Sequence, residues 1–168
     1  MQGSPLPPTA QVIALFASAI LWTHAAAGAL WIGACACFVI AGLALGAGSV
    51  EQRNFVERAA PRIDLLGLAA AIILLATGLF NLMTAGVSRR FAFSTAFMTV
   101  LAIKVALFIV MIAVMTWAMR VGAVIRAVAA RGRTDAMPAA MTRMVRAHLA
   151  IVAMGGIALI LGTWLMGS

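Results

Sequence analysis

Long apolar stretches alternate with short polar ones along the whole chain. Four of them reach the roughly 20 residues that a helix needs to cross a bilayer core: about 12–46, 63–86, 95–119 and 147–167. Because short connections join them, the pattern predicts one all-α domain over residues 1–168, an up-and-down four-helix bundle embedded in a membrane. The third connection is expected to extend both flanking helices around a turn between Gly132 and Pro138.

The composition strengthens the membrane interpretation. Hydrophobic residues make up 65% of the chain and charged residues 10%, against about 45–50% and about 25% in soluble domains. The mean hydropathy is +1.12. The first apolar stretch has no basic residue before it and is longer than the core of a signal peptide, so its helix is expected to be retained.

The positive charge is distributed asymmetrically. Only Arg89 and Arg90 flank the second connection, whereas most other basic residues lie around the first and third connections: Arg53, Arg58, Arg62, Arg120, Arg126, Arg131, Arg133, Arg143 and Arg146. By the positive-inside rule, these two connections face the cytoplasm of a bacterial inner membrane, and both termini face the outer, periplasmic side. The net charge of +8 therefore indicates membrane lipids as partners and not nucleic acid.

Three ionisable residues lie inside the predicted spans: His24, Lys104 and His148. Such residues are costly in a bilayer unless they face the bundle interior and find partners, so each is a functional candidate. Asp64 and Asn81 lie closer to span ends, where water is expected to solvate them.

The helical period places each of these three residues on a line of soft or small side chains. These lines are Gly28, Trp31 and Cys35 beside His24, then Phe108, Met111 and Met115 beside Lys104, and Met141, Met144 and Gly155 beside His148. The second cysteine, Cys37, points away from Cys35, so a disulfide between the two is not expected.

Depth in the membrane separates the two histidines. His24 and Lys104 lie almost equally far from Gln11 and Arg90, the polar ends of their spans, so they are expected to be nearly level, with Asn81 somewhat shallower. His148 is expected near the cytoplasmic interface. Ligation of one haem by both histidines is therefore disfavoured, whereas a haem held by His24 alone, or with Lys104 or a methionine, stays an alternative.

Copper is the other candidate cofactor. Neutral histidine, thiolate and thioether suit copper, and cysteine and methionine select Cu(I). Cys35 and Met115 would line a path from the His24 region toward Met144 and His148. Methionine lines of this kind are more often core packing than ligands, and a hydrogen bond to a neighbouring helix explains His148 as well as a ligand role does.

Four segments, "THAAAGALWIGA", "ATGLFNL", "TAFMTVLAIKVAL" and "RMVRAHLAIV", resemble the CopD-like family, the membrane domain of copper resistance protein D and its short relatives. The resemblance implies a four-helix unit and a role in copper uptake or handling across the inner membrane. Its implied functional positions are His24, Trp31, Gly33, Asn81 and Lys104. This family often has glutamate where this chain has His148, and its larger members have additional helices and domains.

A second resemblance is to HemJ-type protoporphyrinogen oxidases. They also combine a first-helix histidine and tryptophan with a third-helix lysine, an arrangement thought to hold haem. The Asn-Glu-x-Pro signature of their fourth helix is absent here.

Three functions follow as hypotheses. The first is a CopD-like inner-membrane protein that binds copper or haem through His24 and Lys104 and handles metal, together with a periplasmic metal carrier and without catalytic turnover. The second is a haem b redox protein or HemJ-like oxidase served by an electron carrier, with His24 as axial ligand and Lys104 on a propionate or the iron. The third is a small structural subunit of a larger membrane complex.

Overall fold

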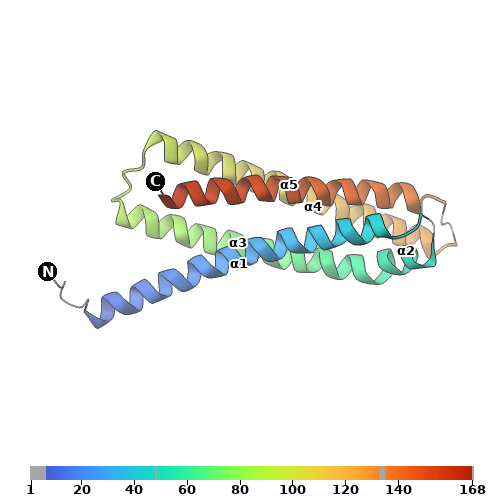
Figure 1. The fold of residues 1–168 in the computed structure, drawn as a ribbon, viewed down its shortest axis with the longest axis horizontal. Helices are drawn as coiled ribbons and strands as arrows, with labels where there is room; N and C mark the ends of the chain where they lie inside the picture. The colour runs from blue at the N-terminus through green and yellow to red at the C-terminus, as the bar shows by residue number, and fades with distance from the viewer. Residues whose placement is uncertain (1–6, 48, 133–134, 168) are drawn as a thin grey trace.

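The computed structural model describes residues 7–47, 49–132 and 135–167. Its elements are helical, and no strand occurs within the described ranges: α1 (Pro8–Ala44), α2 (Val50–Asn54), the π-helical turn η1 (Phe55–Ala59), α3 (Ala60–Ser88), α4 (Thr95–Ala129) and α5 (Met137–Gly167). Four helical segments are long and apolar enough to cross a membrane. The all-α four-helix bundle that the sequence predicts is confirmed (Figure 1).

The helices extend further than the predicted spans on one side of the bundle. α4 continues to Ala129 and α5 begins at Met137, so both flanking helices run into the third connection, as expected. In the first connection, α2 and η1 lead into α3, making one continuous helical stretch from Val50 to Ser88. This extension places Asp64 well inside a helix and not at its end.

A tight turn joins α3 to α4. Arg90 and Phe91 adopt left-handed backbone conformations, with φ of 50° and 58°, and the Phe91 ring packs directly over Gly86, where a side chain would collide with it. Ser94 then caps α4 by accepting a hydrogen bond from the backbone N–H of Phe97.

The four long helices do not pack equally. α1 lies against both α3 and α5, and α4 lies mainly against α5, whereas α3 and α4 have few contacts with each other. The first residues of α1, the last residues of α5 and the α3–α4 turn lie at the same end of the bundle, which we call the terminal end (Figure 1). The opposite end holds α2, η1 and the α4–α5 connection, and we call it the arginine-rich end for the residues that gather there: Arg53, Arg58, Arg62, Arg120, Arg126, Arg131, Arg143 and Arg146. The predicted Arg133 lies outside the described residues.

Two groups of buried side chains form the core. The arginine-end cluster consists of Phe38, Val56, Ala60, Ile125, Ala129, Met137, Met141, Met144 and Val145. The central cluster consists of Trp31, Cys35, Ala70, Ala71, Met111, Met115 and Ile151. At the terminal end, the first half of α1 diverges from the other helices (Figure 1) and exposes large apolar side chains such as Phe16 and Trp22, as expected for a surface in contact with lipid.

Small residues allow the helices to approach each other. A Cβ at Gly67 would lie 2.8 Å from Met115 Cε, and one at Gly155 would lie 2.7 Å from Ile32 Cγ1. Gly78 and Gly162 make room for His24 and Lys104 in the same way. This is the packing role that glycine commonly has between membrane helices.

Candidate functional site

His24 projects from α1 onto α3 near the terminal end. Its Nδ1 lies 2.9 Å from the Oγ1 of Thr77, and its ring rests on Gly78, where a Cβ would lie 3.2 Å from His24 Cε1. The Thr77 hydroxyl donates its proton to the backbone carbonyl of Ile73 at 2.6 Å, so its oxygen accepts the Nδ1 proton of His24. The Leu74 carbonyl provides a further acceptor beside the ring.

The hydrogen bond to Thr77 fixes the tautomer of a neutral His24. Since Nδ1 carries the proton, Nε2 carries the lone pair. A histidine that binds a metal commonly has this arrangement, in which one ring nitrogen donates to a protein oxygen and the other remains free for the ligand.

Lys104 reaches from α4 across to α5. Its Nζ occupies the space beside Gly162, where a Cβ would lie 2.7 Å from it. α1 and α5 run in opposite directions, and Ile32 of α1 contacts Gly155 of α5. Counted from this contact, His24 on α1 and Gly162 on α5 each lie about two helical turns nearer the terminal end, so the two residues are level. His24 and Lys104 therefore lie at the same depth, and the lysine charge acts on the His24 ring.

The ion pairs among the described residues do not include Lys104. Asn81 is half-buried one turn beyond Thr77 on α3, and within the described part of the chain no hydrogen bond joins it to His24 or Lys104. The structure thus brings His24 and Lys104 to one level, with Thr77 as the partner that the sequence analysis missed.

The central cluster contains the sulfur atoms that the sequence analysis singled out. Cys35, Met111 and Met115 are all buried there beside Trp31. Cys37 is exposed, which confirms that only one of the two cysteines faces the interior. Trp31 packs edge-on against Phe108 with ring centroids 5.8 Å apart, and its Nε1 is buried without a hydrogen-bond partner among the residues that the structure describes.

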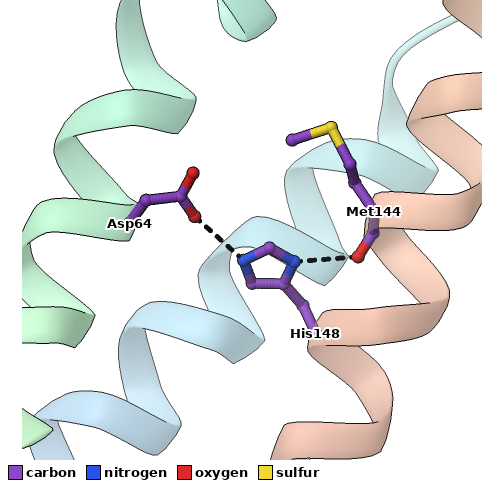
Figure 2. Close-up of polar contacts among 3 residues, drawn as sticks. All are labelled: Asp64, Met144 and His148. Atoms are coloured by element: carbon purple, nitrogen blue, oxygen red, sulfur yellow. Dashed lines mark hydrogen bonds and ion pairs between the residues drawn. The ribbon is translucent and has the colours of Figure 1, made fainter. Parts of the chain in front are cut away.

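Met144 and His148 lie elsewhere, nearer the arginine-rich end. His148 is fully buried and its Nε2 lies 3.2 Å from Oδ1 of Asp64, which is 2% exposed. Its Nδ1 lies 2.8 Å from the backbone oxygen of Met144 (Figure 2). The ring stacks on Phe38 of α1 with centroids 3.8 Å apart and an interplanar angle of 3°.

The prediction that water solvates Asp64 is wrong. The first connection is helical, so Asp64 lies inside an extended helix and faces the bundle core, with His148 of α5 as its partner. The hydrogen bond from His148 to a neighbouring helix, one of the two interpretations from sequence, is confirmed. The sequence signal for this pair is an acid at the start of the apolar stretch 63–86, since a carboxyl group that faces the core requires a buried partner.

A cleft of about 300 Å³ opens between α3 and α4 beside this pair, where the two helices have few contacts. It is lined by Pro61, Asp64, Met119, Arg120, Ala123 and Arg126. Nη1 of Arg126 is buried and has no hydrogen-bond partner within the described ranges. Asp64 therefore lines the same cleft as the two arginines, Arg120 and Arg126.

The predicted ligands do not converge on one point. His24 contacts α3 near the terminal end, the three sulfur residues lie in the central cluster, and Met144 belongs to the arginine-end cluster. Within the described residues, no three histidine, cysteine or acidic side chains are grouped as they would be around one metal ion. The candidate residues form a series along the bundle instead.

The comparisons with known proteins assign no family to this chain. No protein-family model matches the sequence, no curated protein matches it, and no solved structure matches the fold. The resemblances to the CopD-like and HemJ-type families therefore stay predictions from short sequence segments.

Proposed function

We propose that this chain is a multi-pass protein of a bacterial inner membrane that binds copper through His24 and handles the metal without catalytic turnover. The observation that carries the proposal is the ring of His24, whose Nδ1 bonds to Thr77 Oγ1 at 2.9 Å. In the neutral ring this bond keeps the proton on Nδ1 and leaves Nε2 available, the form in which histidine binds transition metals.

The buried sulfur atoms support copper as the metal. Cys35, Met111 and Met115 share the central cluster, and their thiol and thioether groups suit Cu(I) better than harder cations. The Trp31 indole N–H in the same cluster has no partner among the described residues, so it is available to a thiolate formed when metal binds. These residues fit a metal that moves from His24 toward Met144 and His148.

The arginine-rich end supports the proposed orientation of the protein in the membrane. By the positive-inside rule this end lies in the cytoplasm, which places His24 in the outer half of the membrane. A periplasmic metal carrier would then supply the metal. The resemblance of the segments around His24, Asn81 and Lys104 to the CopD-like family is consistent with metal entering from this side.

Haem b is the second candidate, and Lys104 is the observation that favours it. An ammonium group that acts on His24 would repel a copper ion, whereas it would attract a carboxylate such as a haem propionate. In this alternative His24 is the axial ligand and Lys104 holds the propionate. The haem would supply one-electron redox chemistry, in a redox protein or a HemJ-like oxidase.

An oxidised and a dithionite-reduced visible spectrum of the detergent-purified protein, with metal content measured on the same sample, separates these candidates. The proposal is supported if the protein contains stoichiometric copper and shows no Soret band, and if the His24→Ala variant loses the copper. A Soret band that His24→Ala removes supports haem b instead. Neither cofactor would contradict both candidates and favour a structural subunit of a larger membrane complex.

Thr77→Val is expected to weaken copper binding by about 10- to 100-fold, because the ring of His24 loses the acceptor that orients it. Thr77→Ser retains the hydroxyl and should bind nearly as well as the original protein. Thr84→Val is the matched control, since Thr84 also bonds to a carbonyl of its own helix but is exposed. Equal copper affinities for the Thr77→Val and Thr84→Val variants, measured by competition with a Cu(I) chelator, would contradict the role of Thr77.

Cys35→Ser is expected to lower the copper stoichiometry or slow metal release, because it replaces a buried soft ligand by a hard one. Met115→Leu should act in the same direction, since it removes a thioether at nearly constant volume. Cys37→Ser is the control, because Cys37 is exposed on the opposite face of α1. Unchanged stoichiometry and release kinetics in Cys35→Ser would exclude the sulfur path.

A further inference from the structure

The cleft between α3 and α4 has no part in the proposed function at His24, yet it contains an arginine whose buried part has no partner. Arg126 lines the cleft, and its Nη1 is buried without a hydrogen-bond partner among the residues that the structure describes. This nitrogen lies against Gly122, where a Cβ would be 3.1 Å from it. A guanidinium group is always charged, and burying it without a partner is costly. The position of Arg126 therefore points to an anion that comes from outside the chain.

The acid in the cleft does not supply this anion. Asp64 also lines the cleft, but its carboxyl group is directed toward His148, whose Nε2 lies 3.2 Å from Oδ1 (Figure 2). Within the described ranges, the ion pairs include neither Arg120 nor Arg126. An anion that enters the cleft would thus meet two guanidinium groups and one carboxyl group that is already engaged.

Both guanidinium groups lie at the depth of lipid headgroups. α4 begins at Thr95, directly after the turn at the terminal end, and this residue marks one edge of the hydrocarbon core. At about 1.5 Å per residue, Arg120 lies about 38 Å from Thr95 along the helix, and Gly122, which Arg126 Nη1 contacts, about 41 Å. The hydrocarbon core is about 30 Å thick and the headgroup layer follows it. The cleft therefore opens into the headgroup layer at the arginine-rich end.

Apolar side chains continue the cleft toward the centre of the membrane. The helical period extends the cleft face of α3 to Ile72 and Leu75, and that of α4 to Val105 and Ile109. All four side chains are exposed, and α3 and α4 have few contacts with each other. A pair of cations at headgroup depth above an open apolar groove matches the shape of a phospholipid, which has a phosphate group above two acyl chains.

We propose that the α3–α4 cleft binds the phosphate group of an anionic phospholipid, with Arg120 and Arg126 as donors and the acyl chains along the groove between the two helices. The cleft volume of about 300 Å³ accommodates a phosphate group with its glycerol. The planar fork of a guanidinium group suits phosphate oxygens, and basic pockets between membrane helices are a recurring kind of lipid site. The bound lipid fills the gap between two helices that hardly contact each other.

Lipid binding to the full chain, purified in an uncharged detergent, tests the proposal. Phosphatidylglycerol is the probe, and native mass spectrometry measures how much of it stays bound as its concentration is raised. Diacylglycerol with the same acyl chains lacks the phosphate, and glycerol 3-phosphate lacks the chains, so both are expected to bind at least about tenfold more weakly. Equal binding of diacylglycerol would overturn the phosphate site, and equal binding of glycerol 3-phosphate would overturn a lipid as its occupant.

Arg126→Gln is expected to weaken the binding of phosphatidylglycerol at least about tenfold, because the phosphate loses charge-assisted hydrogen bonds. Arg126→Lys retains the charge but not the planar fork, so its affinity should lie between the two. Arg143→Gln is the matched control, since Arg143 is exposed at the same end of the bundle and does not line the cleft. Its loss should cost at most about fivefold, the general attraction of one basic residue to an anionic lipid surface. Equal losses in Arg126→Gln and Arg143→Gln would overturn the proposal.

A second pair of variants tests the cleft without changing any charge. Ala123→Trp fills the cleft with an indole ring and is expected to weaken phosphatidylglycerol binding at least about tenfold. Val124→Trp is its control, because Val124 is the next residue of α4, is 64% exposed and does not line the cleft. Weaker binding in Ala123→Trp alone supports the site, and equal affinities in the two variants would overturn it.

Discussion

His148→Phe is expected to lower the free energy of unfolding by about 3–5 kcal/mol, because it leaves the buried Asp64 carboxyl without its partner. Phenylalanine keeps a flat ring that can stack on Phe38, so packing changes little. The loss comes from Asp64, which stays buried and no longer has a hydrogen-bond donor at Oδ1. Reversible unfolding of the purified protein in mixed micelles of mild detergent and dodecyl sulfate measures the change.

The double variant Asp64→Leu/His148→Phe tests whether the stability lost in His148→Phe comes from the unpaired Asp64 carboxyl or from changed packing. It replaces both polar groups by apolar ones of similar size, so most of the lost stability is expected to return. Asp64→Leu alone should cost about 1–3 kcal/mol, because a neutral His148 keeps its bond to Met144 but leaves Nε2 unsatisfied. A double variant as unstable as His148→Phe would show that the loss comes from packing and would contradict this explanation.

Trp31→Ala is expected to destabilise the bundle by about 3–5 kcal/mol, the usual cost of truncating a buried tryptophan. Inside a bilayer this cost reflects weaker van der Waals packing between the helices, since lipid is as apolar as the core. The indole ring packs against Gly67 and Phe108, and an alanine at this position would reach neither of them. The same unfolding assay in mixed micelles measures the difference.

Trp22→Ala is the matched control for Trp31→Ala. Trp22 belongs to the same helix but is 74% exposed, so its loss should change stability by no more than about 0.5 kcal/mol. Trp31→Phe should lie between the two, because it loses volume but also removes a buried N–H that lacks a partner among the described residues. Similar losses for Trp31→Ala and Trp22→Ala would contradict the assignment of Trp31 to the central cluster.

Helix geometry predicted much of this arrangement from sequence alone. The period of the α-helix was enough to place Cys35 inside and Cys37 outside, and equal distances from the polar span ends were enough to place His24 level with Lys104. Both results depend only on rise and rotation along single helices. The bundle itself followed from the lengths of the four apolar stretches.

Contacts between helices were harder to predict. The prediction for Asp64 was wrong because the helical first connection moved it from the end of a span to the interior of a longer helix. Thr77 was missed because its role depends on which face of α3 meets α1, and a threonine carries no charge that would draw attention to it. Helix rotation and register are set by side-chain packing across the bundle, and periodicity within one helix does not determine them.

The weak contact between α3 and α4 has a consequence for biosynthesis. These two helices follow each other in the chain, yet each packs mainly on a different neighbour, α3 on α1 and α4 on α5. We therefore expect the protein to assemble from two helical hairpins, the first complete when α3 has entered the membrane and the second only after α5. Until the last helix emerges from the ribosome, α4 lacks its main partner and Asp64 lacks its histidine, so the nascent chain is most exposed to quality control at that stage.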